Sequence, residues 1–195
     1  MMQRAKANTA LLLIDVQNHF DNPALGRRNN PDAEEKMAVL LQTWRTLGRP
    51  VIHIQHISNP DAPHHSGRDI KEIVTPLPHE PVFVKQVNSA FIGTNLELYL
   101  REKGIDSLVI AGLTTDHCVS TTTRMAKNLG FTPYIVADAT ATFDRVSFDG
   151  QLHRAEEIHH LALVSLHGEF ATVVETASLL EVPQEIFPLN KETIS

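Results

Sequence analysis

The sequence has little of several features that mark particular classes of protein. Its 195 residues include one cysteine, so no disulfide can form within the chain and a small scaffold held together by disulfides is excluded. No apolar run approaches the roughly 20 residues of a membrane-spanning helix. Lysine and arginine number 17 against 23 aspartates and glutamates, and the net charge of −6 leaves no basic stripe for nucleic acid. These absences predict a soluble, cytoplasmic protein that binds neither nucleic acid nor membrane.

What remains is an ordinary globular composition. Hydrophobic residues make up 42% of the chain and charged residues 21%, which is enough apolar surface for a sizeable core. The length and the lack of linkers, repeats or low-complexity tracts predict a single domain over residues 1–195. No signal peptide is expected, because Asp15 interrupts the apolar run 10–14 before it reaches the roughly 7–15 residues that such a segment needs.

Short apolar runs alternate with helical patterns along the chain. Strands are expected at residues 10–16, 51–57, 82–84, 108–111, 134–137 and 161–166. Helices are expected at residues 31–47, with Asn30 as N-cap, and at 94–104, 116–129, 150–160 and 176–180. The alternation predicts an α/β fold: one doubly wound, Rossmann-like domain whose six-stranded, mostly parallel sheet has helices on both faces. Residues 59–81 fit neither period and carry five prolines, as expected of a loop that covers a site.

Three reactive side chains stand at the predicted carboxyl ends of strands, where open parallel sheets bind their ligands. Asp15 ends the first strand, Lys85 directly follows the third, and Cys118 lies in the first turn of the helix after the fourth. Alone, each has an ordinary structural explanation, such as a capping carboxylate, a solvated lysine or a buried apolar thiol. A helix start and a nearby cation would both lower the pKa of a thiol. Together the three side chains indicate nucleophilic catalysis.

The motifs around these residues resemble one known family. Four motifs are similar to those of the isochorismatase-like cysteine hydrolase superfamily. They are Leu13-Ile-Asp15-Val-Gln17, Lys85 with Ser89-Ala-Phe91, the segment from Gly112 through Thr115-Asp116 and Cys118-Val119 to Thr122 and Ala126, and Asp138-Ala139. The order and spacing of the motifs match from about residue 9 to residue 180.

The resemblance implies a catalytic triad and a reaction. The family triad falls on Asp15, Lys85 and Cys118, and the family's cis peptide on Leu113–Thr114. The backbone N–H groups of Thr114 and Cys118 would form an oxyanion hole. The implied activity is hydrolysis of a small-molecule amide or ureide through a cysteine thioester, without a cofactor.

Two other functions remain open from the sequence. One is an isochorismatase-type hydrolase that cleaves a vinyl ether and depends less on the cysteine. The other is a non-catalytic binding or scaffold protein that keeps the fold, although such a protein has no need of all three triad residues. In each case a small hydrolase domain of this kind is expected to form a homodimer or homotetramer.

Substrate-binding residues are expected on position alone, near the ends of strands. These are Gln17, Phe20, His56, Asn88, Phe91, His117 and Phe143. His167-Gly-Glu169-Phe170 is expected at the same sheet edge, where Glu169 could serve a subunit interface or a helix cap.

Eleven histidines suggest a metal site, but their positions argue against one. His53 and His56 are three apart on a predicted strand, so they point to opposite faces and cannot share an ion. The nicotinamidases of the family carry a metal-binding Asp-x-His pair after the second strand, and His56 and Ser58 stand at those positions here. His64 or His65 could join His56, but three or four ligands would be needed. No metal is expected.

Overall fold

A single parallel sheet organises the protein. The computed structural model describes residues 8–180. The sheet has the strand order β3-β2-β1-β4-β5-β8, and every neighbouring pair runs parallel. Its strands are β1 (Thr9–Ile14), β2 (Val51–His56), β3 (Val82–Lys85), β4 (Ser107–Leu113), β5 (Thr132–Ala141) and β8 (Thr172–Val174).

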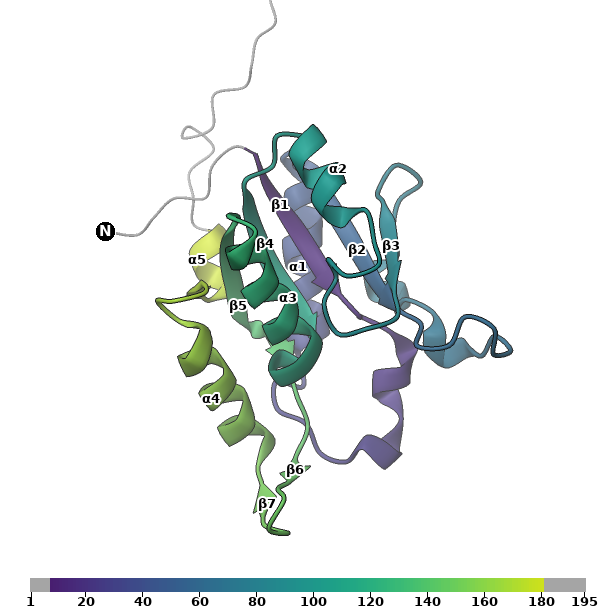
Figure 1. The fold of residues 1–195 in the computed structure, drawn as a ribbon, viewed down its shortest axis with the longest axis vertical. Coiled ribbons are helices and arrows are strands. Elements are labelled where there is room, and N and C mark those ends of the chain that lie inside the picture. Colours follow the sequence, from purple (N-terminus) through teal and green to yellow (C-terminus); the bar gives the residue numbers. More distant parts are fainter. Residues whose placement is uncertain (1–7, 181–195) are drawn as a thin grey trace, which may run out of the picture.

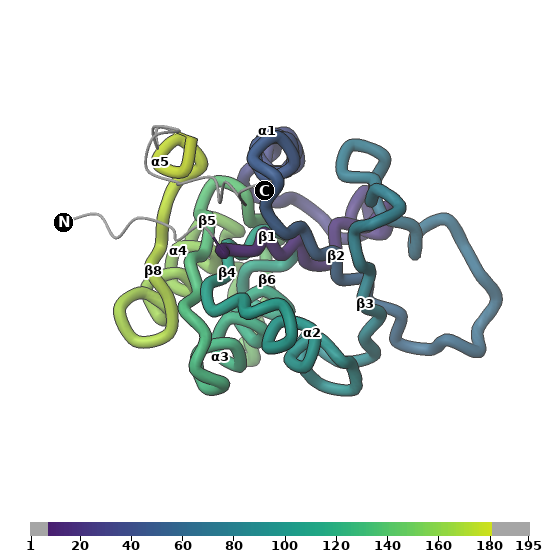
Figure 2. Tube along the Cα trace, turned by 90° about the horizontal axis from the view of Figure 1, so that it is seen from above, coloured from purple at the N-terminus to yellow at the C-terminus, as the bar shows by residue number. Residues whose placement is uncertain are grey.

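Helices cover both faces of this sheet. They are α1 (Ala33–Thr46), α2 (Leu96–Glu102), α3 (Ser120–Asn128), α4 (Ala155–Leu166) and α5 (Thr176–Leu180). Figure 2 shows α1 and α5 on one side and α2, α3 and α4 on the other. The predicted α/β class and the six-stranded sheet are therefore confirmed.

The core explains why the first strand lies in the middle of the sheet. All six residues of β1 are buried. Alternate side chains enter opposite layers: Leu12 packs with the α2 and α3 side, and Leu11 packs with Met37 and Trp44 of α1. The indole N–H of Trp44 donates to the Thr9 carbonyl at 3.0 Å, so α1 is fixed to the start of β1 by a buried hydrogen bond.

The strand predicted at residues 161–166 was wrong, because this segment is the second half of α4. Leu163 and Leu166 are buried while Leu161 and Val164 are more than half exposed, so the buried side chains are three residues apart, as in a helix, and not two apart, as in a strand. The sixth strand is β8, which lies further along the chain. A short hairpin, β6 (Arg145–Val146) with β7 (Leu152–His153), occupies the place where this helix was expected to begin (Figure 1).

Two helix starts also differ from the predictions. Asn30 does not cap α1, which begins at Ala33 after Asp32. Asn30 takes a left-handed conformation with φ 42°, and its side chain donates to the carbonyls of Ala137 and Thr140 in β5. The helix predicted from residue 116 is preceded by a π-helical turn, η5 (Thr115–Val119), and α3 begins at Ser120.

The proline-rich segment 59–81 is irregular, as predicted. It contains the short 3-10 turns Ser66–Arg68 and Glu72–Val74 and extends away from the sheet beyond β3 (Figure 2). Among residues 8–180, no helix combines the length and the apolar character needed to cross a membrane.

Candidate active site

The ends of three strands bring Asp15, Lys85 and Cys118 into contact. Asp15 follows β1, Lys85 is the last residue of β3, and Cys118 lies in η5, directly after β4. The Lys85 Nζ lies 2.7 Å from the Asp15 Oδ2 and 3.3 Å from the Cys118 Sγ. All three residues are at most 9% exposed. The buried ammonium therefore links the carboxylate to the thiol.

The backbone around Asp15 directs its side chain into this cluster. Asp15 has φ 51°, a left-handed conformation that non-glycine residues adopt at a cost of roughly 1–2 kcal/mol. Its N–H donates to the Ile54 carbonyl at 3.0 Å, and its own carbonyl accepts from the Gln17 N–H at 2.8 Å. These bonds hold the turn that ends β1 and carries the chain out of the sheet.

Gly112 allows β4 to pass close to β1 just before Asp15. A Cβ atom at this position would lie 2.0 Å from the Ile14 carbonyl oxygen, and the φ of 129° is one that other residues rarely adopt. Two residues further on, the Leu113–Thr114 peptide bond is cis.

The surroundings of Cys118 favour the protonated thiol. Burial raises the pKa of Cys118 to about 12, and the Asp15 carboxylate adds to the rise, while the Lys85 ammonium acts in the opposite direction. The sequence-based expectation of a lowered pKa was therefore wrong, because burial outweighs the lysine. A base must remove the thiol proton, and the Asp15 Oδ1 is buried without a hydrogen-bond partner among the described residues.

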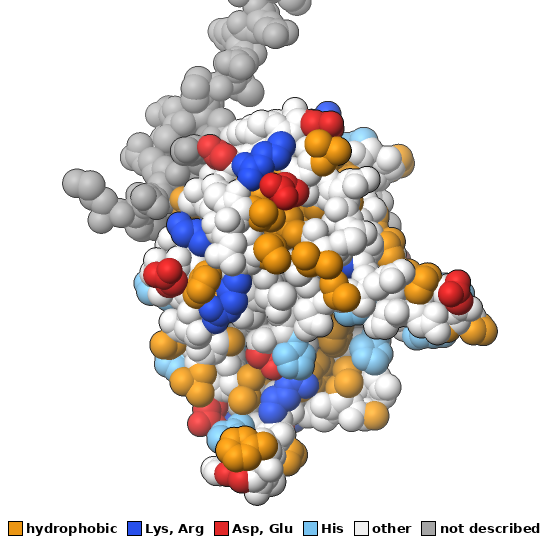
Figure 3. Space-filling model, viewed as in Figure 1, with side chains coloured by type: hydrophobic (Ala, Val, Ile, Leu, Met, Phe, Trp, Pro, Cys, Tyr) orange, Lys and Arg blue, Asp and Glu red, His pale blue; other side chains and the backbone are white. Residues whose placement is uncertain are grey.

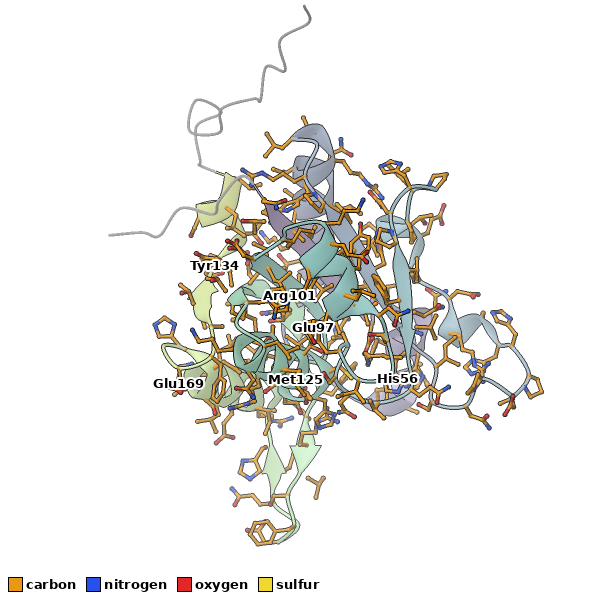
Figure 4. All side chains as sticks on the ribbon, turned by 45° about the horizontal axis from the view of Figure 1, so that its top comes forward. His56, Glu97, Arg101, Met125, Tyr134 and Glu169 are labelled. Atoms are coloured by element: carbon orange, nitrogen blue, oxygen red, sulfur yellow. The ribbon has the colours of Figure 1, made fainter. Side chains whose placement is uncertain are left out.

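His56 joins this cluster from β2. Its Nδ1 lies 2.9 Å from the Lys85 Nζ and 3.8 Å from the Cys118 Sγ, and its Nε2 lies 3.0 Å from the Ser58 Oγ. Figure 4 shows His56 at the end of its strand, on the side of segment 59–81, and Glu169 far across the molecule. Glu169 is thus remote from this cluster.

A cavity of about 430 Å³ opens beside the cluster. Asp15, Cys118 and His56 contribute to its lining, together with Gln17 and Phe20. Segment 59–81 forms a wall of this cavity. Figure 3 shows several histidine side chains on the lower half of the visible face.

Gln17 and Phe20 line the cavity as the sequence predicted, but the Gln17 amide is occupied. Its Nε2 donates to the carbonyls of His56 and Arg68 at 3.1 and 2.8 Å, and its Oε1 accepts from the His56 N–H at 2.8 Å. Gln17 therefore fixes the end of β2 to the segment that forms the cavity wall. Phe20 stacks on Phe143, which is buried behind it, with the ring centroids 6.1 Å apart.

The other four predicted binding residues are not in the lining of this cavity. Phe143 supports the wall through Phe20, and Phe91 packs in the core against Phe131, with the ring centroids 5.8 Å apart. Asn88 is exposed on the segment after β3. His117 is also exposed and lies beside Asp116. These residues were predicted because they follow strands in the sequence. That position does not determine the direction in which each side chain points.

Several other lining residues were not predicted as site residues, and His19 and Arg68 are two examples. His19 lies four positions after Asp15, and this short distance was the available signal. Arg68 lies in the irregular segment, where no periodic pattern indicates direction. Its guanidinium donates to the carbonyls of Asn59 and Ala62 at 2.7 and 3.0 Å and thereby holds that segment in place.

The donor atoms of the cluster do not fit a metal ion. Ligand atoms of Asp15, His56 and Cys118 all lie within 4.8 Å of one another. The Lys85 ammonium, however, is 2.7 to 3.3 Å from each of these side chains and takes the position that an ion would need. His64 is paired instead with Asp69, at 2.8 Å.

Comparison with known proteins places this arrangement in a family. The family model described as the isochorismatase domain matches residues 9–178. The isochorismatase family protein YrdC of Bacillus subtilis is 48% identical over 177 residues, which cover 88% of this chain and 94% of that protein.

Solved structures and named enzymes agree with this match. An isochorismatase-family protein from Chromobacterium violaceum superposes with a TM-score of 0.88 at 43% identity, over 92% of this chain and 97% of that one. A streptothricin hydrolase of Streptomyces noursei is 34% identical over 138 residues, covering 69% of this chain and 50% of that enzyme.

Proposed function

This chain belongs to the isochorismatase family of hydrolases, and we propose that it cleaves an amide or ureide bond of a small molecule through a thioester on Cys118. The observation that carries the proposal is the position of the Lys85 ammonium between the Asp15 carboxylate and the Cys118 thiol. A nucleophile, a base and a charge that stabilises both are the parts that such a reaction needs.

The first step is attack by sulfur. Because the pKa of Cys118 is about 12, the thiol is protonated at neutral pH, and Asp15 takes its proton as the Cys118 Sγ attacks the carbonyl carbon. The sulfur–carbon bond forms while the carbonyl π electrons move to oxygen. The Lys85 ammonium stabilises the negative charge that develops on the sulfur.

The tetrahedral intermediate then collapses to a thioester. The N–H groups of Thr114 and Cys118 donate to the oxyanion. In other enzymes one such donor stabilises the transition state by about 3 kcal/mol. The carbon–nitrogen bond breaks, and the protonated Asp15 gives its proton to the departing amine or ammonia. Water, deprotonated by Asp15, attacks the thioester, releases the acid and restores the thiol.

The cavity favours small substrates without a positive charge. Its volume is about 430 Å³, and among the described residues Asp15 is the one carboxylate in its lining. Asp15 already binds Lys85, whereas His19, His65 and Arg68 line the wall. Neutral or anionic amides should therefore be accepted over cationic analogues.

The test is release of ammonia or amine from a panel of small amides and ureides in matched neutral, carboxylated and aminated forms. We expect turnover of neutral or carboxylated members, and Cys118→Ala should lower it by at least about 10³-fold. Circular dichroism of the variant serves as the folding control. Full amide turnover by Cys118→Ala would contradict the proposal, and so would cleavage of a vinyl ether but of no amide.

A further inference from the structure

The Lys85 ammonium has a complete set of hydrogen-bond acceptors, and His56 supplies one of them. An ammonium carries three N–H donors. Around the Lys85 Nζ lie the Asp15 Oδ2 at 2.7 Å, the His56 Nδ1 at 2.9 Å and the Cys118 Sγ at 3.3 Å. The Lys85 side chain is fully buried, so an N–H group without a protein acceptor there would be costly.

This contact determines the protonation state of His56. An ammonium can only donate, so the His56 Nδ1 must accept and cannot carry a proton. The proton is therefore on Nε2, which donates to the Ser58 Oγ at 3.0 Å. The geometry requires a neutral imidazole with a single tautomer.

The backbone holds His56 in place for this contact. His56 and Lys85 stand at paired positions in the parallel strands β2 and β3. Gln17 accepts from the His56 N–H at 2.8 Å and donates to the His56 carbonyl at 3.1 Å. Both strands and the segment after β1 thus fix the distance between the imidazole and the ammonium.

We infer that His56 is a positioning residue: its neutral imidazole holds the Lys85 ammonium against Asp15 and Cys118, and its protonation releases that ammonium. The inference rests on the proposed function and extends it to a fourth side chain. A protonated His56 would place two positive charges 2.9 Å apart and lose the acceptor. Its Nδ1 is also 3.8 Å from the Asp15 Oδ2, so an imidazolium would compete with Lys85 for that carboxylate.

Several charged and titratable groups face His56. Asp15, Lys85 and Cys118 approach it from the ends of β1 and β3 and from η5. His19, His65 and Arg68 share the lining of the adjoining cavity. Protonation of His56 would repel the Lys85 ammonium from Asp15 and Cys118, so activity should fall as the pH is lowered.

The test compares His56→Asn with His56→Leu, and His160→Leu, at an exposed histidine of α4, is the matched control. Asparagine offers an acceptor near the position of Nδ1 but does not titrate, whereas leucine offers none. Two quantities are measured across pH 5 to 9: the rate at which iodoacetamide alkylates the chain's one cysteine, and kcat with KM for an accepted amide. Alkylation needs no substrate, so it reports on the Lys85–Cys118 contact even if the proposed function fails.

We expect His56→Leu to lower both kcat and the alkylation rate by at least about tenfold, with KM little changed. His56→Asn should restore most of the loss and flatten the fall of kcat on the acid side, and His160→Leu should behave nearly as the unchanged protein. A rise in KM with kcat and alkylation unaltered would make His56 a substrate contact and overturn the inference. Equal behaviour of the Asn and Leu variants would also overturn it. Because His56→Asn keeps its polar contact, its pH profile decides the question even if His56→Leu fails to fold.

Discussion

At the scale of single residues, the active centre depends on backbone conformation as much as on side-chain chemistry. Gly112 leaves no space for a side chain beside Ile14, and Asp15 follows directly in a left-handed conformation. The distance between β1 and β4 therefore sets the position of the Asp15 carboxylate.

Gly112→Ala should damage both stability and activity. The added methyl group would lie 2.0 Å from the Ile14 carbonyl oxygen, which is backbone and cannot move away without separating the strands. We expect a loss of roughly 1–3 kcal/mol in the free energy of unfolding, measured by urea denaturation, and a fall in the turnover of any accepted amide. Gly130→Ala is a useful comparison, because it also has a positive φ, 86°, but no atom lies within 4 Å of the Cβ. Equal losses in the two variants would show that φ, and not the close approach to Ile14, is responsible.

The sequence could predict which residues gather but not how they interact. Asp15, Lys85 and Cys118 were predicted from their places at strand ends, since parallel strands present those ends at one edge. The raised pKa of Cys118 could not be predicted, because it follows from burial by side chains far along the chain. The contact of His56 with Lys85 depends on the register of β2 and β3, which no local pattern reveals.

At the scale of secondary-structure elements, Glu80 joins three parts of the fold. It accepts from the Arg45 guanidinium of α1 through both carboxylate oxygens, at 2.8 Å each, and lies 3.0 Å from the His53 Nε2 of β2. The Leu77 N–H also donates to it, at 2.9 Å. Burial would raise the pKa of Glu80, but Arg45 and these other donors outweigh it and hold that pKa at about 2.

This carboxylate makes the stability of the protein depend on pH. The pKa of Glu80 is lowered from 4.5 to about 2 on folding, so the unfolded chain binds the proton more readily. The stabilisation is therefore present above about pH 4.5 and is lost as the pH falls towards about 2. Glu80→Gln should cost about 3 kcal/mol at pH 7 and reduce the acid dependence of urea unfolding. An unchanged pH dependence in this variant would assign the effect to other carboxylates, such as Glu34, whose pKa is also about 2.

Helices and strands could be predicted where the spacing of apolar residues fits the period of a helix or that of a strand, but not both. The long buried strands and α1 follow their patterns, whereas the apolar run 161–166 is compatible with either period. The π-helical turn η5 had no signal in the sequence, although it positions Cys118 between β4 and α3. In both places contacts with the rest of the fold, and not local preference, decide the structure.

At the scale of the whole molecule, we propose that copies of the chain associate. Figure 3 shows hydrophobic side chains gathered around α2 and the segment before it. Val87, Ile92 and Leu98 are 44%, 48% and 57% exposed there. Covering them against a second copy would remove this apolar surface from water.

Light scattering should give the mass of a dimer or tetramer. Leu98→Glu should shift the distribution towards the monomer by placing a charge in the contact, whereas Phe148→Glu, at a fully exposed residue of the β6–β7 hairpin, should not. A monomer at all concentrations would contradict the proposed association. Dissociation of the Phe148→Glu variant but not of Leu98→Glu would show that the contact lies at the hairpin instead.

The buried, protonated thiol of Cys118 also bears on how the protein withstands oxidants. Hydrogen peroxide attacks the thiolate far faster than the thiol, and a pKa of about 12 keeps the thiolate scarce at neutral pH. A sulfenic acid on this residue could not be protected by a second cysteine, because the chain has none. Because the proton stays on sulfur until a substrate carbonyl arrives, the nucleophile is protected from peroxide. This protection matters because the chain has no second cysteine that could reverse the oxidation.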